Sequence, residues 1–336
     1  MCVAVAPAQA KRELRDAEPS GPRPDFVYLI VGDSLSDTGR CFAAGGVPDS
    51  RLYYDGRFSN GPVWVDVLKA NLSAPQGRQG GRKRVQFLNY AFGAATACPV
   101  PGHIARYPFV QHLQAQTAAA VADLAAGRVL RGRGTRVVAV QWVGANDLQL
   151  ALEAGSLTDP QAVAAAAAAV AGCRLAAVQA LLAAGVRDVV LGPLPPLHLA
   201  PIVPGPLKEK VAAMVRGFNA ALAAGVGALQ AGLDGAGAGA RVALLGDADN
   251  AWVEGDRAGA ARDGLVLDEP CVATDAMELR APTLRPPVCP DPSKHIFYDP
   301  RHPGAAYHAW FALEGLLPRL RALGLAPPAP PCPGDD

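Results

Sequence analysis

Residues 26–39 read FVYLIVGDSLSDTG, a continuous apolar run that stops at Gly32 and is followed by small polar residues. An apolar run of this length, rich in residues that favour strands and bounded by a glycine, predicts a strand that is buried on both faces. Such strands belong to parallel sheets that helices cover on both sides. The stretch therefore favours an α/β fold in which polar residues directly follow the first strand.

The rest of the chain repeats this pattern, with short apolar runs separated by stretches of helical spacing. The predicted strands are residues 26–31, 84–90, 136–143, 187–191 and 241–245. The predicted helices are residues 62–70, 118–130, 160–184, 207–233 and 304–323. Because strands and helices alternate, we expect a three-layer α/β/α sandwich around a mostly parallel five-stranded sheet.

The chain of 336 residues is expected to form a single domain over residues 25–325. Residues 1–24 are polar and Pro-rich, and are predicted to be a tail or the end of a truncated signal peptide. Residues 326–336 are predicted to be a Pro-rich C-terminal tail. Residues 247–300 show no clear periodicity, and an irregular stretch of this length inside a domain indicates a functional role or a covalent staple.

The composition excludes several classes of protein. With 50 % hydrophobic and 18 % charged residues, the chain is not intrinsically disordered. A net charge of +1 offers no electrostatic attraction for nucleic acid, and the longest apolar run, residues 162–173, is too short to span a membrane. No dinucleotide or P-loop motif follows the first strand, and no Cys/His spacing is typical of zinc. We therefore expect no cofactor, no metal, no nucleic-acid partner and no transmembrane segment.

Polar candidates follow the first three predicted strands, where a parallel sheet binds its ligands. Ser34 follows the first strand and is a candidate nucleophile, since a serine hydroxyl reacts when a base lies beside it. Gly93 follows the second strand and lets the backbone approach a ligand. Asn146 follows the third, where its amide could stabilise an oxyanion. Taken singly, each residue is also explained as a helix cap or a turn.

Asp299 and His302 complete the set near the C-terminus. In a turn, residues three apart can face each other, so Asp299 could accept from one imidazole nitrogen and orient the other. The alternative is a surface turn, because the surrounding prolines and glycine form turns themselves. Together the candidates supply a nucleophile, a base, an orienting carboxylate and oxyanion donors. This combination predicts acyl transfer to water.

Five segments extend this interpretation to a family. They are VGDSLSDTG (31–39), GRFSNGPVW (56–64), NYAFGAAT (89–96), VGAND (143–147) and DPRHP (299–303). In order and spacing they resemble the GDSL (SGNH) hydrolases, a family of lipases, esterases and acylhydrolases, especially the plant- and fungal-type members. The resemblance implies a flavodoxin-like sandwich and a serine ester hydrolase, with a lipid, acylated-carbohydrate or small-molecule ester as substrate.

The resemblance also assigns roles to the candidates. Ser34 would be the nucleophile that forms an acyl-enzyme, His302 the general base and then acid, and Asp299 the residue that orients the imidazole. The oxyanion hole would combine the Ser34 backbone N–H, a backbone N–H of the second segment and the Asn146 side chain. The family commonly has Gly-Gly in that second segment, whereas this chain has Gly93 followed by Ala94. Gly93 is the predicted donor, with Ala94 as the alternative.

Two alternatives remain beside the general ester hydrolase. One is a carbohydrate O-acetyl esterase of the same family, and the other is a catalytically silent binding protein on the same scaffold. The remaining histidines, His103 among them, are expected to be surface or capping residues. Neither the ester's chain length nor the oligomeric state follows from the sequence.

The chain has seven cysteines, so at least one thiol is unpaired. Cys271 and Cys289 flank a Pro-rich loop, and from the residues alone they are either a disulfide or two small apolar residues. A Cys-containing loop precedes the last segment in plant-type members, and this resemblance favours the disulfide. With the N-terminal residues, it also favours a secreted protein.

Overall fold

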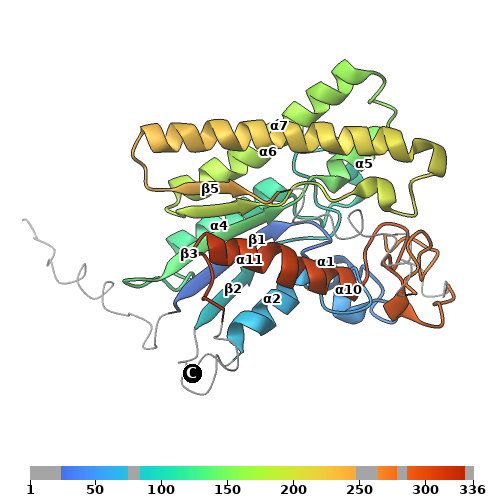
Figure 1. Ribbon diagram of the computed structural model, residues 1–336, viewed down its shortest axis with the longest axis horizontal. Helices are drawn as coiled ribbons and strands as arrows, with labels where there is room; N and C mark the ends of the chain where they lie inside the picture. Colours follow the sequence, from blue (N-terminus) through green and yellow to red (C-terminus); the bar gives the residue numbers. More distant parts are fainter. Residues whose placement is uncertain (1–23, 75–83, 247–263, 278–285, 330–336) are drawn as a thin grey trace, which may run out of the picture.

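The computed structural model describes residues 24–74, 84–246, 264–277 and 286–329. Its centre is one sheet of five strands in the order β2-β1-β3-β4-β5, and every neighbouring pair is parallel (Figure 1). The strands are β1 (Phe26–Gly32), β2 (Val85–Asn89), β3 (Arg136–Trp142), β4 (Asp188–Leu191) and β5 (Arg241–Leu244). All five strands predicted from apolar runs are confirmed to within two residues at each end.

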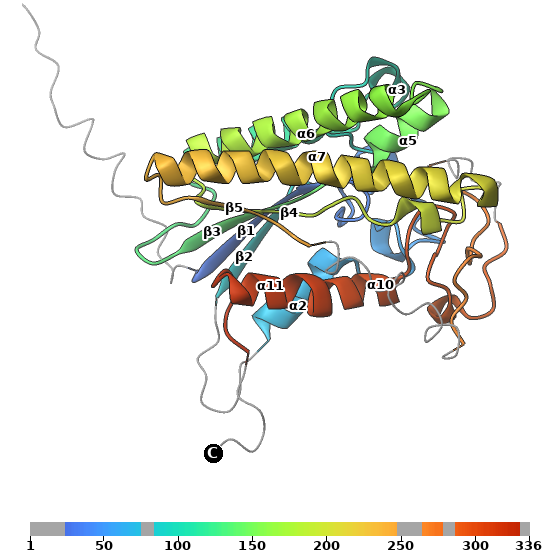
Figure 2. The ribbon, with the colours of Figure 1, turned by 45° about the horizontal axis from the view of Figure 1, so that its top comes forward.

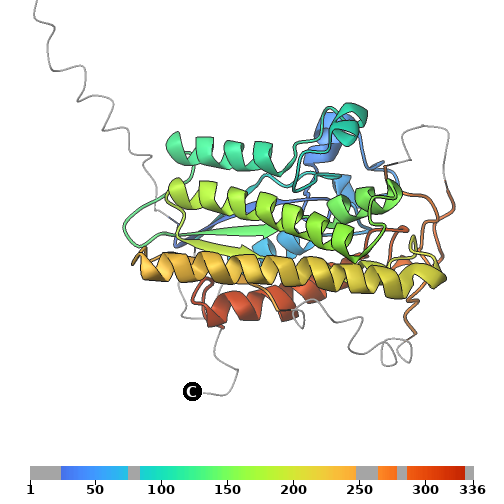
Figure 3. The ribbon, with the colours of Figure 1, turned by 90° about the horizontal axis from the view of Figure 1, so that it is seen from above.

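Helices cover both faces of the sheet and make it the middle of three layers. One face is covered by α4 (Leu113–Ala125), α6 (Pro160–Ala183) and α7 (Lys208–Gly235), which lie side by side over the strands (Figure 3). The opposite face is covered by α2 (Trp64–Ser73) and the C-terminal helix that ends in α11 (Leu317–Ala322) (Figure 2). The predicted α/β/α sandwich is confirmed.

The side chains of β1 show why polar and apolar residues do not alternate in the first apolar run. Val27, Leu29 and Val31 pack into the core beneath α4, α6 and α7. Tyr28 and Ile30 point to the opposite side and pack with α2 and the C-terminal helix. Because a strand turns successive side chains to opposite faces, burial on both sides requires apolar residues at every position.

The predicted helices are present, and the largest differences concern α4 and the C-terminal helix. α4 begins five residues earlier than expected and ends where Gly127 adopts a left-handed φ of 70°. The predicted helix 304–323 is divided into α10 (Ala305–Trp310), a π-helical segment (Phe311–Leu316) and α11. The π segment ends two residues before Pro318, which has no N–H for a regular helical hydrogen bond.

Three short helices follow strands or turns near the site and lie outside the predicted helices. They are α1 (Arg40–Gly45), α3 (Pro101–Arg106) and α5 (Ala145–Glu153). By length and composition, α6 and the segment 205–235 that contains α7 could each cross a membrane. They pack against each other and against the sheet, as core helices do.

Two disulfides tie the loops around the carboxyl ends of the strands. The pairing of Cys271 with Cys289 is confirmed. A second disulfide, between Cys98 and Cys173, joins the loop after β2 to α6 and was not predicted.

Segments 264–277 and 286–300 hold only isolated bridges and one short 3₁₀ turn, in line with the predicted irregular stretch. Most of the two predicted tails, residues 1–23 and 330–336, lies outside the described residues.

Candidate active site

Ser34 lies on a tight turn at the carboxyl end of β1. The Asp33 carbonyl accepts from the N–H groups of Ser36 and Asp37, and the Asp33 carboxylate accepts from Leu35 N (3.1 Å). Gly32 precedes this turn, where a Cβ would lie 2.7 Å from the Trp142 carbonyl oxygen of the neighbouring strand. These contacts fix the backbone of the turn.

The two serines of the motif have different surroundings. Ser36 is fully buried, and its Oγ accepts a hydrogen bond from the Trp64 indole N–H (3.0 Å). Ser34 is 7 % exposed, and its Oγ lies 2.9 Å from His302 Nε2. Only the Ser34 hydroxyl therefore adjoins a base.

The structure brings Ser34, His302 and Asp299 into one chain of hydrogen bonds although the first two are 268 residues apart. His302 Nδ1 lies 2.8 Å from Asp299 Oδ2. Because a carboxylate only accepts, Nδ1 carries the proton and Nε2 is free to accept from the Ser34 hydroxyl. The loop after His302 is held by Asn60, whose Oδ1 accepts from Ala305 N (2.8 Å).

Asp299 is fully buried and its carboxylate accepts four hydrogen bonds. Oδ1 accepts from the backbone N–H groups of Arg301 (2.8 Å) and His302 (2.7 Å). Oδ2 accepts from His302 Nδ1 and from the Tyr53 hydroxyl (2.7 Å). Tyr53 was missed in the sequence because nothing local links it to a residue 246 positions away.

Two effects shift the pKa values of Asp299 and His302: the burial of both side chains and the attraction between them. Burial alone would lower the pKa of His302, but the Asp299 carboxylate beside it holds that pKa above its ordinary value. Burial alone would raise the pKa of Asp299, but His302 and the hydrogen bonds to the carboxylate hold it below its ordinary value. The arrangement keeps Asp299 ionised and makes His302 a stronger base.

The predicted donor Gly93 is already occupied, which corrects that assignment. Gly93 N donates to Asp37 Oδ2 (2.7 Å), and a Cβ at this position would lie 2.3 Å from the Phe58 ring. Gly93 therefore holds the loop against the serine turn and has no N–H left for a ligand.

Among residues 93–98, every backbone N–H but one donates to a protein acceptor. The donations run from Gly93 to Asp37, Ala95 to Phe92, Thr96 to His112, and Ala97 and Cys98 to Asp147. Within the described part of the chain, Ala94 N has no such acceptor. Ala94 adopts a left-handed φ of 61° and lines the cavity beside Ser34 and His302. The alternative donor, Ala94, is the one the structure leaves available.

Asn146 is the first-turn residue of α5 and lies at the same cavity as Ser34. One hydrogen of its amide donates to the Ala95 carbonyl (2.8 Å), which leaves the second for a ligand. The adjacent Asp147 points away and accepts from Ala97 and Cys98. Asn146 is thus a candidate donor, and Asp147 holds the loop that carries Ala94.

Two buried charges lie beneath these loops. Burial raises the pKa of Asp33 to about 7. Arg174, on α6, is 2 % exposed, and burial lowers its pKa to about 10. Its guanidinium donates to Gln141 Oε1 (2.8 Å) and to the Gly192 carbonyl (2.7 Å), at the carboxyl ends of β3 and β4. Arg174 therefore fastens the strands from which the site loops leave.

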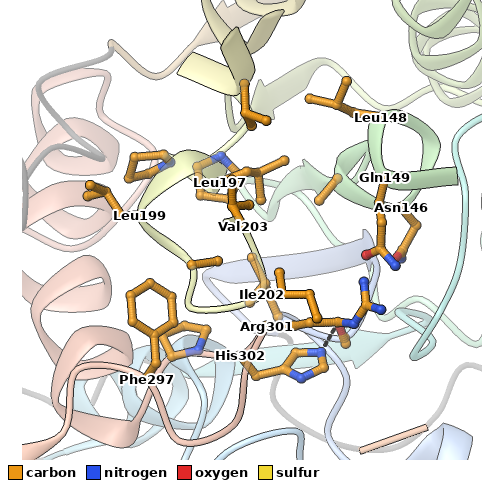
Figure 4. Close-up of a pocket in the computed structure, with 18 of the residues that line it drawn as sticks. Asn146, Leu148, Gln149, Leu197, Leu199, Ile202, Val203, Phe297, Arg301 and His302 are labelled. Atoms are coloured by element: carbon orange, nitrogen blue, oxygen red, sulfur yellow. Dashed lines mark hydrogen bonds between the residues drawn. The ribbon is translucent and has the colours of Figure 1, made fainter. Parts of the chain in front are cut away.

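An apolar cavity of about 120 Å³ opens on one side of Ser34. Figure 4 shows His302 and Asn146 at its edge. The apolar residues that line it come from the segment after β4, from α5 and from the loop before His302, and include Leu148, Leu197, Leu199, Val203 and Phe297 (Figure 4). This wall offers contact to hydrocarbon and almost no hydrogen-bonding partners.

A polar cavity of about 320 Å³ adjoins Ser34 and His302 as well. Its lining includes His103, Arg106 and Glu153. Arg301 lines both cavities and forms ion pairs with Asp275 and with Glu153 (3.5 Å). The hydroxyl of Ser34 therefore lies between an apolar and a polar space.

A protein-family model described as GDSL-like lipase/acylhydrolase matches residues 28–314. The chain belongs to this family. Membership in the GDSL-like lipase/acylhydrolase family confirms the resemblance inferred from the motifs and implies a hydrolase that acts on esters.

Individual relatives of this GDSL-like protein match it either over a short stretch or at low sequence identity. A stretch of 49 residues is 53 % identical to a phosphatidylcholine-sterol acyltransferase of Aeromonas hydrophila, which covers 14 % of this chain and 15 % of that one. A putative GDSL-like lipase from Parabacteroides merdae is 12 % identical, with 91 % and 98 % of the two chains covered and a TM-score of 0.45. An acetylxylan esterase from Geobacillus stearothermophilus is 13 % identical, with coverages of 89 % and 94 % and a TM-score of 0.37.

No cluster of three or more His, Cys, Asp or Glu side chains that could hold a metal ion occurs in the described segments of this GDSL-like chain. The candidate site consists of a hydroxyl, an imidazole, a carboxylate and amide donors.

Proposed function

We propose that this protein is a serine ester hydrolase that forms an acyl-enzyme on Ser34. As Ser34 Oγ attacks the ester carbonyl carbon, His302 Nε2 takes the hydroxyl proton and then gives it to the departing alcohol oxygen. His302 next takes a proton from the water that attacks the acyl carbon, and gives this proton to Ser34 Oγ as the acid is released. Asp299 holds the imidazole in the required tautomer throughout.

The oxyanion that forms in each step needs donors that are not otherwise engaged. We assign this role to the backbone N–H groups of Ser34 and Ala94 and to the second amide hydrogen of Asn146. What supports Ala94 over Gly93 is the elimination of the other N–H groups in residues 93–98. A tetrahedral anion there would take three hydrogen bonds from groups already fixed in place.

The observation that carries the proposal is the continuous chain from Asp299 through His302 to Ser34 Oγ. A fluorophosphonate probe tests it, because such probes react only with an activated serine. We expect labelling at Ser34, found by peptide mass spectrometry, together with hydrolysis of a p-nitrophenyl ester. A protein that neither reacts with the probe nor hydrolyses the ester would be the silent binding protein instead.

The apolar cavity favours a hydrocarbon acyl group over acetyl. An acetyl group would leave the wall formed by Leu148, Leu197 and Val203 without contact. An apolar cavity of about 150 Å³ takes up benzene, so about 120 Å³ suits a chain of about five or six carbons. The alcohol part of the ester would then occupy the polar cavity.

We expect kcat/KM for p-nitrophenyl esters to rise from acetate to hexanoate by about fourfold per methylene, since each buried methylene contributes about 0.8 kcal/mol. Filling the cavity with Val203→Trp should remove this rise and spare the acetate. Leu207→Trp serves as the control, because Leu207 is exposed and outside the cavity lining. A wild-type preference for acetate would favour the carbohydrate O-acetyl esterase.

Activity should also fall in acid, because His302 must be neutral to accept a proton. The Asp299 carboxylate raises the pKa of His302, so the midpoint of the fall in kcat/KM should lie above the ordinary value of about 6.5. Below that midpoint the imidazole is protonated and the enzyme inactive. A midpoint below 6 would contradict the assignment of His302 as the base.

The two disulfides are compatible with an oxidising compartment, where such bonds persist. We propose a secreted protein with one catalytic domain over residues 25–325. Thiol counting on protein purified from its source, before and after reduction, tests the compartment, since a cytosolic protein would show reduced cysteines.

A further inference from the structure

We propose that His103 is a positioning residue of the oxyanion hole, which fixes Ala94 so that its N–H stays directed at the reacting carbonyl. The inference rests on the proposed ester hydrolase function and adds a residue to it. It also revises the expectation that His103 is a surface or capping histidine.

The contact that carries the inference joins the imidazole to the Ala94 peptide. His103 Nε2 lies 2.8 Å from the Ala94 carbonyl oxygen, and both residues line the polar cavity with Ser34 and His302. A carbonyl only accepts, so Nε2 must donate its hydrogen. Either the neutral Nε2–H tautomer or the protonated ring can do this, so the role needs no charge on His103.

Ala94 needs such a partner because its backbone is unfavourable. Its φ of 61° is left-handed, a region that is sterically unfavourable for residues other than glycine. The peptide between Phe92 and Gly93 is anchored through Gly93 N to Asp37, and the carbonyl after that of Ala94, the Ala95 carbonyl, accepts from Asn146. In the described part of the chain, His103 is the hydrogen-bond donor to the Ala94 carbonyl.

The imidazole is itself held in place. Its ring centroid lies 5.1 Å from that of Tyr107 and 5.7 Å from that of His112, both edge-on. His112 Nδ1 in turn accepts from Thr96 N (3.1 Å) in the same loop. The packing of these rings links α3 to residues 93–98, so the position of His103 is transmitted directly to Ala94.

A matched pair of variants separates the hydrogen bond from the packing. Glutamine at 103 can reach the Ala94 carbonyl with an amide N–H, whereas methionine has similar length and no donor. We expect His103→Met to lower kcat for a p-nitrophenyl ester about 10- to 30-fold with KM within twofold, less than the 10²- to 10³-fold for removing an oxyanion donor directly. His103→Gln should keep at least a third of wild-type kcat.

A boronic acid inhibitor provides a readout that a merely structural role would not change. It forms a tetrahedral adduct with the serine, so its affinity depends on the oxyanion donors. We expect His103→Met to lose boronate affinity by about the same factor as kcat, with an unchanged Tm. Ile104→Ala, an exposed neighbour on α3 that lines neither cavity, is the control and should match the wild type.

The outcomes separate the inference from the proposed function. Equal kcat in His103→Met and wild type, or equal losses in the Met and Gln variants, would overturn the role of His103. If His103→Met lowers Tm, the Gln variant decides: it must retain both kcat and boronate affinity. A wild-type protein without hydrolysis or probe labelling would instead refute the ester hydrolase, whatever the variants do.

Discussion

Replacing Ser34 with alanine should lower kcat about 10⁶-fold and leave the fold intact. Members of a catalytic triad act as a unit, so loss of the nucleophile removes nearly the whole contribution of the group. The Ser34 hydroxyl contacts His302 Nε2, and the backbone turn depends on Asp33. Alanine therefore removes the reacting oxygen without removing a contact that holds the turn.

The natural control is Ser36→Ala, because both serines belong to the same motif. Ser36 Oγ accepts from Trp64 and lies away from the imidazole. We expect this variant to keep hydrolysis within a few-fold and to lose about 1 kcal/mol of unfolding free energy. Single-turnover kinetics and denaturant unfolding check both variants. Turnover above trace level in Ser34→Ala would show that the nucleophile is misassigned. The same would follow if Ser36→Ala lost fluorophosphonate labelling while Ser34→Ala kept it.

Asp299→Asn should lower kcat about 10⁴-fold, since an amide cannot hold the imidazole in the correct tautomer. The four hydrogen bonds to this carboxylate make the substitution especially unfavourable. If the Asn nitrogen replaces Oδ2, it faces the donors of His302 Nδ1 and Tyr53. If it replaces Oδ1, it faces the backbone N–H groups of Arg301 and His302. Either orientation opposes donor to donor.

Tyr53→Phe is a milder change for comparison, because it removes one of the four hydrogen bonds to Asp299 and keeps the carboxylate. We expect a loss of about ten- to a hundredfold in kcat, since a single hydrogen bond to a charged group contributes about 1.5–3 kcal/mol and each 1.4 kcal/mol corresponds to about tenfold in rate. The midpoint of the pH profile should move to lower pH in Asp299→Asn, because His302 loses the charge that raises its pKa. Asp299→Asn activity above a tenth of wild type would refute the role of Asp299.

The sequence predicted the sheet well for a local reason. Strand β1 is buried on both faces, so its whole length must be apolar, and this pattern is visible without any knowledge of its neighbours. The helix α5 is only 9 residues long, so the apolar side chains that it turns to the core, Leu148, Ala151 and Leu152, are too few to stand out as a helical period in the sequence.

The oxyanion donor shows most clearly what the sequence alone does not predict. Gly93 and Ala94 are adjacent, and glycine is the residue that a sequence argument selects for close approach to a ligand. The structure uses Gly93 to pass under the Phe58 ring and to bind Asp37, and places the available N–H on Ala94. Which N–H of a loop is free depends on the acceptors around it, and outside the loop these come from three other segments, at Asp37, His112 and Asp147.

By itself the sequence determined the α/β architecture, the family and the identity of the hydroxyl, imidazole, carboxylate and amide that meet at the strand ends. These follow from local apolar patterns and from short motifs, both of which lie within a few consecutive residues. Only the tertiary structure decided the partners: Tyr53 on Asp299, His103 on Ala94, and Cys98 on Cys173. Tyr53 and Asp299 are 246 residues apart and Cys98 and Cys173 are 75 apart, whereas His103 lies on the short helix that follows the Ala94 loop. Such contacts depend on how these segments pack together, because no local pattern along the chain encodes them.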